Sequence, residues 1–187
     1  MKAGGGKAKG AAQERKVCQQ LSMWLSNGKR KDLLWRSAMS GGRATLGLRK
    51  GEKHTSQGGD VSAIDPMGAG LTDKFFIEIK FLKDLDLAAF WLGYGTLFRF
   101  WVQAKAEARK YGKEAMLIAK QNRYDTLVIV EADCKLAFPS IIRWRSYKYN
   151  ATVMLFDDML KLKHPGLMGW LMNWGDPAMR RSFGVKH

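Results

Sequence analysis

The chain has 187 residues, 46% of them apolar, and its 32 Lys and Arg against 17 Asp and Glu give a formal charge of +15 at pH 7. This size predicts one domain with a hydrophobic core, and the charge favours a polyanionic partner, with nucleic acid ahead of an anionic membrane surface. Because no stretch approaches roughly 18 consecutive apolar residues and no signal pattern is present, we expect a cytoplasmic protein without a membrane segment.

The opening stretch MKAGGGKAKG combines glycine with lysine and has no apolar periodicity, which predicts a flexible basic arm over residues 1–10. No repeat or low-complexity tract follows, so residues 11–187 are expected to form a single domain. The two cysteines, Cys18 and Cys134, lack metal-site spacing and are expected to be reduced thiols in the core.

A helix is predicted after residue 10, because apolar side chains recur there at spacings of three and four until Asn27 and Gly28. The members of this stripe are Val17, Cys18, Leu21, Trp24 and Leu25. Extending the stripe backward reaches Glu14, three residues before its first member. A carboxylate is therefore expected at the edge of a surface that faces the core.

Three strands are predicted next, separated by a long loop and a turn. DLLWRSA forms a short strand, and residues 39–59 form a glycine-rich basic loop, of a length that is usually functional or disordered. DVSAID alternates as a strand, PMGAG has the proline and glycines of a turn, and DKFFIEIKFLKD contains the third strand.

The third strand places opposite charges inside an apolar run. Because side chains alternate along a strand, Glu78 and Lys80 share one face and the neighbouring isoleucines share the other. An antiparallel hairpin with its turn near residues 68–70 pairs Asp60 with residues 77–80. We therefore expect Asp60 to lie beside Glu78 and Lys80.

Residues 87–115 are aromatic-rich and mostly helical, with Gly112 as the expected end of the helix. AMLIAKQ and TLVIVEA then indicate two buried strands joined by NRYD. The tail contains the strand-like segments IIRWRSYKY and ATVMLF and a short helix in DDMLKLKH.

Carboxylates that cluster resist ionising together, so two acidic groups beside a lysine favour a hard divalent cation with oxygen ligands. Mg²⁺ fits this description, since it binds through one or two carboxylates plus substrate phosphate and can lower the pKa of a water. Lys80 could orient that water, and Glu14 could approach from the helix as a direct or water-mediated ligand.

This order of residues, a helix-borne Glu, then GGD, then EIK, resembles the PD-(D/E)XK nuclease superfamily. GAAQERKV, WRSAMSGG and GGDVSAID resemble in particular the archaeal-type Holliday-junction resolvases and their phage relatives. The resemblance implies an α/β fold with a restriction-endonuclease-like αβββαβ core, a mixed central sheet flanked by helices. It covers about residues 9–130, and glycine replaces the motif's proline in GGD. The nuclease-like core is expected over about residues 11–135, with about 136–187 as a C-terminal extension.

The resemblance implies roles for individual residues. Asp60 and Glu78 correspond to metal ligands, Lys80 to the residue that assists the attacking water, and Glu14 to a residue that supports the metal. The nucleic-acid contacts it implies are Arg15, Arg36, Ser40 (with Ser37 as an alternative alignment) and Gln103 in WVQAK. Arg43 is expected to contact DNA on a separate ground, because the charges of the glycine-rich loop suit a backbone that wraps a duplex.

Together these features predict a Mg²⁺-dependent DNA endonuclease, with Mn²⁺ as a substitute, that hydrolyses phosphodiester bonds in branched DNA such as a four-way junction. Symmetric cutting of a junction needs two active sites, which predicts a homodimer. If a phage encodes the protein, the compartment is the host cytoplasm.

Several alternatives stay open at the level of sequence. The chain could be a superfamily nuclease with another substrate, or a non-catalytic basic protein that binds or packages DNA. Glu78 and Lys80 could be a solvated ion pair, and Asp60 could be a turn or cap residue. The tryptophans could stack on unpaired bases, but aromatic residues at helical spacing are more often core or interface.

Overall fold

The computed structural model of the protein describes residues 5–37, 58–136, 139–162 and 169. The chain runs from a long N-terminal helix to a short C-terminal one, with helices and strands mixed between them. Their order is α1 (Gly5–Leu25), β1 (Leu34–Arg36), β2 (Val61–Ala63), α3 (Pro66–Lys74), β3 (Phe75–Leu82), α4 (Leu87–Leu92), α5 (Gly95–Lys110), β4 (Glu114–Gln121), β5 (Leu127–Val130), β6 (Ile142–Ser146), β7 (Ala151–Leu155) and α6 (Phe156–Leu160).

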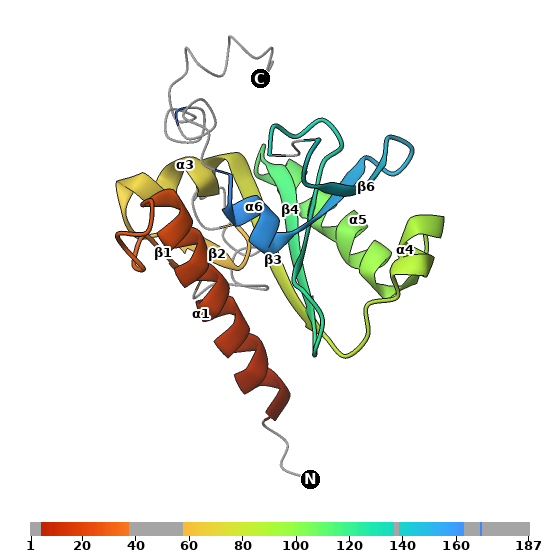
Figure 1. Ribbon diagram of the computed structural model, residues 1–187, viewed down its shortest axis with the longest axis horizontal. Coiled ribbons are helices and arrows are strands. Elements are labelled where there is room, and N and C mark those ends of the chain that lie inside the picture. Colours follow the sequence, from red (N-terminus) through yellow and green to blue (C-terminus); the bar gives the residue numbers. More distant parts are fainter. Residues whose placement is uncertain (1–4, 38–57, 137–138, 163–168, 170–187) are drawn as a thin grey trace.

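A mixed five-stranded sheet forms the centre of the molecule, with the strands in the order β3-β4-β5-β7-β6 (Figure 1). β3 and β4 are parallel and are connected through α4 and α5, whereas the other neighbouring pairs are antiparallel. β1 and β2 pair with each other as a separate antiparallel ribbon. β3 therefore lies at one edge of the main sheet.

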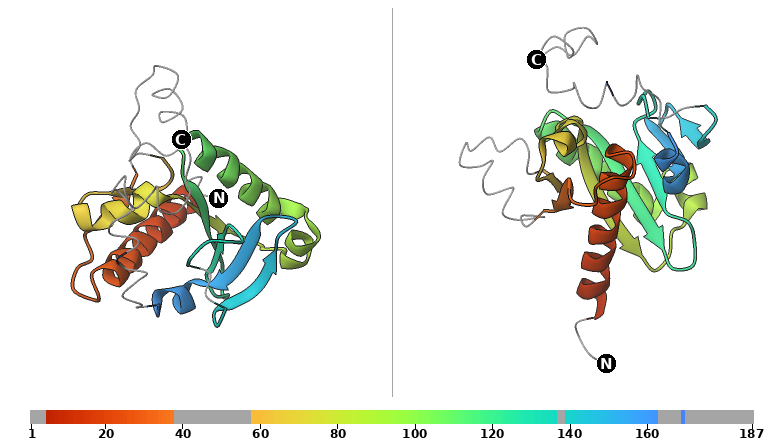
Figure 2. Two further views of the ribbon diagram at one scale, coloured as in Figure 1. Left: turned by 90° about the horizontal axis from the view of Figure 1, so that it is seen from above. Right: turned by 60° about the vertical axis from the view of Figure 1, so that its left-hand side comes forward.

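Helices cover both faces of this sheet, with α1 and α3 on one side and α4 and α5 on the other (Figures 1 and 2). The predicted stripe of α1 is buried in the first core together with Ile77 and Ile79 of β3. Phe76 belongs to the second core, beneath α5, where Leu97 and Trp101 are buried. The alternation predicted for β3 is present, and the predicted α/β class with a mixed sheet flanked by helices is confirmed.

The hairpin expected between residues 60 and 80 is wrong, because residues 66–74 form α3. Asp65 accepts a hydrogen bond from the Met67 N–H, 2.9 Å away, and Pro66 occupies the first turn, where its missing N–H costs nothing. Gly68 lies against β1, since a Cβ there would stand 2.7 Å from the Leu33 carbonyl oxygen. The glycine serves close helix–strand packing rather than a turn.

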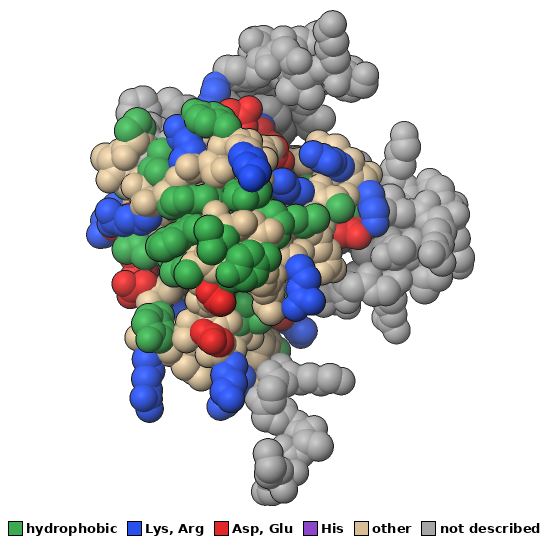
Figure 3. Space-filling model, turned by 90° about the vertical axis from the view of Figure 1, so that its right-hand side faces the viewer, with side chains coloured by type: hydrophobic (Ala, Val, Ile, Leu, Met, Phe, Trp, Pro, Cys, Tyr) green, Lys and Arg blue, Asp and Glu red, His purple; other side chains and the backbone are tan. Residues whose placement is uncertain are grey.

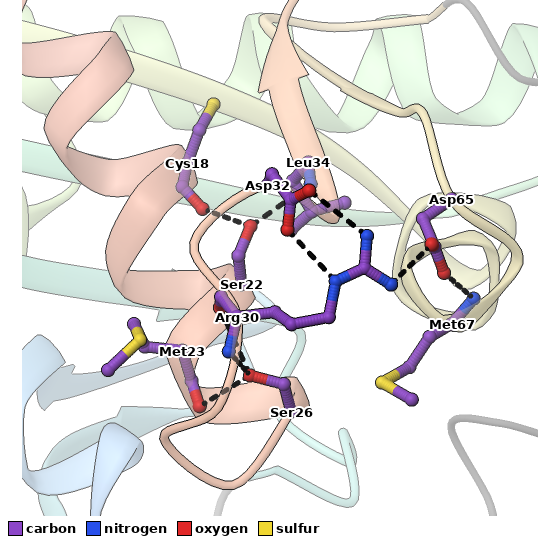
Figure 4. Close-up of polar contacts among 9 residues, drawn as sticks. All are labelled: Cys18, Ser22, Met23, Ser26, Arg30, Asp32, Leu34, Asp65 and Met67. Carbon is purple, nitrogen blue, oxygen red and sulfur yellow. Dashed lines mark hydrogen bonds and ion pairs between the residues drawn. The ribbon is translucent and has the colours of Figure 1, made fainter.

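A polar network holds the turn between α1 and β1 against α3 (Figure 4). The Arg30 guanidinium binds Asp32 at 3.0 Å and Asp65 at 2.6 Å. The Ser22 hydroxyl donates to the Cys18 carbonyl and accepts from the Leu34 N–H at 3.0 Å. These contacts fix the position of β1 relative to α1.

Two further segments differ in extent from the expectation. α1 begins at Gly5, inside the stretch predicted as a flexible arm. β6 and β7 complete the central sheet, so part of the C-terminal extension belongs to the core of the fold.

Cys18 and Cys134 are buried free thiols, as expected. Within the described residues, none of the helices has the length and apolar character that crossing a bilayer requires.

Candidate active site at the edge of the sheet

Asp60 lies against the free edge of β3 and is bound to it twice. Its N–H donates to the Ile77 carbonyl at 2.8 Å, and its side-chain Oδ2 accepts the Ile79 N–H at 2.8 Å. Gly59 forms a parallel bridge with Ile77. The chain thus approaches β3 in parallel, not as the antiparallel partner expected from the hairpin, and the carboxylate still arrives beside Glu78.

Two glycines permit this approach. Gly59 has a φ of +93°, and a Cβ there would lie 2.5 Å from the Ile77 carbonyl oxygen, so a larger residue would push the chain off the strand. A Cβ at Gly58 would lie 3.1 Å from the Tyr111 ring. The GGD motif therefore has a steric basis in the contact between residue 59 and β3.

Glu78 and Lys80 lie on the same face of β3 and form an ion pair with each other. The Lys80 ammonium also lies 5.3 Å from the centroid of the Phe100 ring of α5, a favourable cation–π contact. Both side chains are partly exposed, so the pair is open to a ligand from solution.

Glu14 and Arg36 form a second ion pair, between α1 and β1. Arg36 pairs with Val61 across the two-stranded ribbon, and the Ser37 N–H donates to the Asp60 carbonyl at 2.9 Å. β1 therefore brings Arg36 close to Asp60. Glu14 already has a cationic partner in this arrangement.

The electrostatics of Asp60 distinguish it from the other carboxylates. Burial, followed by the charges of Glu78 and Glu14, raises the pKa of Asp60 from 3.8 to about 7, against the opposing effects of the Ile79 N–H and Lys80. Burial and the neighbouring Glu14 and Asp60 also raise the pKa of the Cys18 thiol to about 12. Negative charge at this edge is thus incompletely compensated.

This donor set fits a divalent cation. Three carboxylates face two cationic side chains locally, in a chain whose overall charge is +15. Among the described residues no group of three or more His, Cys, Asp and Glu is arranged to hold a metal ion. Asp60 and Glu78 are the two carboxylates that could hold Mg²⁺, which binds through one or two carboxylates with waters and substrate phosphate, and Glu14 is engaged by Arg36.

Two of the remaining predicted residues lie on helices of the described structure. Arg15 is exposed on α1, next to Glu14 in sequence. Gln103 is exposed on α5, three residues after Phe100, and so on the neighbouring turn of the same helix. Ser40 and Arg43 lie outside the described residues.

Sequence reasoning missed Phe100, whose ring lies beneath Lys80, and the stacked rings of Phe76 and Tyr111, 5.7 Å apart, which lie next to Gly58. The aromatic spacing of residues 97–111 indicated a buried helix face. Nothing in that spacing distinguishes a ring packed in the core from a ring that contacts a charged site residue.

A family model described as "Phage putative PDDEXK endonuclease" matches residues 5–165 of the chain. The chain belongs to this family. The match spans most of the protein and confirms the resemblance to the PD-(D/E)XK nucleases, so the family makes this chain a nuclease, which is a hydrolase. No curated protein and no solved structure gives a significant match.

Proposed function

We propose that this protein is a Mg²⁺-dependent endonuclease that hydrolyses phosphodiester bonds in DNA at the site formed by Asp60, Glu78 and Lys80. The observation that carries the proposal is the hydrogen bond from the Ile79 N–H to the Asp60 carboxylate, because it holds that carboxylate beside Glu78 at the edge of β3. Mn²⁺ is the expected substitute ion.

Asp60 and Glu78 are the residues that would hold the ion, and the uncompensated charge at Asp60 gives them a reason to bind it. When bound, Mg²⁺ stabilises charge on the scissile phosphate and lowers the pKa of an attacking water. The Lys80 ammonium, held between Glu78 and the Phe100 ring, donates hydrogen bonds to that water or to a phosphate oxygen.

Arg36 and Glu14 have supporting roles in this proposal. The Arg36 guanidinium is partly exposed at the margin of the site and can contact a phosphate, while Glu14 orients it. Arg15 and Gln103 would contact the DNA backbone from the helices on either side of the site. Ser40 and Arg43 remain proposals that rest on the sequence alone.

We propose branched DNA, such as a four-way junction, as the first substrate to test, cut by a homodimer into products with a 5′-phosphate and a 3′-hydroxyl. The resemblance of GAAQERKV, WRSAMSGG and GGDVSAID to the resolvases supports this choice. The formal charge of +15 supports a polyanionic substrate.

The test incubates the protein with labelled linear, forked and four-way DNA in Mg²⁺, Mn²⁺ or chelator, beside Asp60→Asn and Lys80→Ala. We expect both variants, and chelator, to abolish cutting and to leave DNA binding intact, because neither change removes the basic surface. Cutting by Asp60→Asn at the wild-type rate would refute the site. Binding without cutting by the wild type in either metal would instead indicate a non-catalytic DNA-binding protein.

A further inference from the structure

Large apolar side chains are exposed where α4 meets the turn between β6 and β7. The exposed fractions are 46% for Trp91, 66% for Leu92, 58% for Tyr94 and 75% for Tyr147. We call these four residues the aromatic surface. Figure 3 shows hydrophobic side chains gathered at the centre of the face that carries α4 and α5, which is more apolar area than isolated surface residues present.

The aromatic surface is held rigidly. The Tyr149 hydroxyl donates to the Leu92 carbonyl at 3.0 Å, and its ring packs so closely on Gly93 that a Cβ there would lie 2.6 Å away. The Tyr149 carbonyl accepts a hydrogen bond from Lys105 of α5 at 3.0 Å. The β6–β7 turn and α4 therefore form one preorganised unit, which lowers the entropic cost of binding a ligand.

Two lysines lie beside the aromatic surface. The Lys148 ammonium lies 5.1 Å from the Tyr149 ring centroid, and Lys105 lies 5.3 Å from that of Trp101. Figure 3 shows Lys and Arg side chains on several sides of the apolar centre, with acidic side chains among them, some directly below it. The two lysines complement the charge of a phosphate group.

α5 lies between the proposed active site and the turn that carries part of the aromatic surface. Phe100 of α5 contacts Lys80, whereas Trp101 donates a hydrogen bond to the Tyr149 carbonyl at 3.3 Å. An α-helix with its side chains is about 10–12 Å across. That width corresponds to roughly three nucleotide steps of a DNA strand, so a strand at Lys80 that crosses α5 can reach the exposed rings.

We propose that the aromatic surface binds the unpaired nucleotides of a tailed or branched DNA substrate, its rings stacking on bases and its lysines contacting phosphates. The inference rests on the proposed function, because it adds a binding subsite to the same active site. It assigns recognition of unpaired bases to α4 and the β6–β7 turn, whereas Asp60 and Glu78 serve hydrolysis.

The test measures binding in chelator, so that cleavage does not enter. A Trp91→Ala/Tyr147→Ala variant is compared with wild type on blunt duplex and on the same duplex with a single-stranded tail. We expect the variant to bind tailed DNA about tenfold more weakly per stacked base lost and to bind blunt duplex as the wild type does. Trp91→Phe, which keeps an aromatic face, should retain most of the affinity.

Tyr124→Ala is the matched control, since Tyr124 is also exposed, in the turn between β4 and β5, and is predicted to leave both affinities unchanged. Equal loss on blunt and tailed DNA, or no loss on either, would overturn the proposal. A change of oligomeric state in Trp91→Ala/Tyr147→Ala would also overturn it and assign the surface to a second copy. Failure of Asp60→Asn to abolish cutting would refute the hydrolytic site separately.

Discussion

At the scale of single residues, the site places a buried carboxylate where an ionised group is unfavourable. The exposed fraction of Asp60 is 7%, and its pKa is raised to about 7 mainly by burial and by Glu78. A cation at the site would relieve both effects. Binding of the ion and ionisation of Asp60 are therefore expected to be linked.

The first prediction concerns the pH dependence of stability without metal. Between pH 4 and pH 7 folded Asp60 keeps a proton that the unfolded chain has lost, so the free energy of unfolding falls as the pH rises through this window. The loss from this group is at most about 4 kcal/mol. Urea unfolding at pH 5 and pH 8 in chelator measures it.

Asp60→Asn should weaken this pH dependence and be more stable than wild type at pH 8, and Mg²⁺ should stabilise the wild type more at pH 8 than at pH 5. A pH dependence identical in the variant and the wild type would show that Asp60 ionises normally.

The second prediction concerns Gly59. Gly59→Ala would put a side chain at a residue with positive φ, and its Cβ would lie 2.5 Å from the Ile77 carbonyl oxygen. The substitution should therefore lower the free energy of unfolding by about 1–3 kcal/mol, and it should reduce cleavage because it displaces Asp60. Gly10→Ala is the control, because nothing lies within 4 Å of its Cβ and alanine favours the helix. Thermal unfolding and cleavage assays measure both; a fully active Gly59→Ala would contradict the steric role of this glycine.

At the scale of elements, α3 takes the place of the expected turn and determines how the chain passes from β2 to β3. Asp65 caps α3 and binds Arg30, which also holds the end of α1 (Figure 4). One carboxylate thus connects the helix that carries Glu14 with the helix that leads into β3. Its pKa is lowered, first by the Met67 N–H and then by Arg30.

The third prediction follows from this connection. Asp65→Ala removes the cap and one partner of Arg30, and should lower the Tm by roughly 2–4 °C at neutral pH. Asp32→Ala leaves the cap in place and should lower the Tm less. Since the folded-state pKa of Asp65 is lowered, its contribution is present at neutral pH and is lost as the pH falls into the acid range. Equal Tm values for the two variants would assign the effect to Arg30 alone.

At the scale of the whole molecule, the formal charge of the chain is +15, whereas three carboxylates lie with only two cationic side chains at the edge of β3. In the proposed function, the positive charge of the chain would attract the DNA backbone, and the carboxylates at the edge of β3 would bind a cation. Binding and hydrolysis should therefore respond to different changes in solution.

The fourth prediction concerns salt. The affinity for duplex DNA should fall steeply with salt, with a log–log slope of about −0.9 for each phosphate neutralised. Asp60→Asn should keep the wild-type slope, because it leaves the basic exterior unchanged. Fluorescence anisotropy titrations at salt concentrations from about 50 to about 300 mM measure the slope, because counterion release has a large effect on affinity in this range. A flat response would exclude backbone contacts as the main source of affinity.

The sequence by itself determined the class of fold, the main strands, the stripe of α1 and the family, because these follow from periodicity and from motifs carried on short stretches. It also brought Asp60 beside Glu78, but through a hairpin that does not exist. Glycine and proline at residues 66–70 fit both a turn and the start of a packed helix.

Only the tertiary structure decided that the chain before Asp60 runs parallel to β3, that Arg36 forms an ion pair with Glu14, and that the Phe100 ring lies beneath Lys80. Each of these contacts joins elements that are far apart in sequence, so no local propensity encodes it. The burial that raises the pKa of Asp60 arises in the same way, from the packing of several elements around one carboxylate.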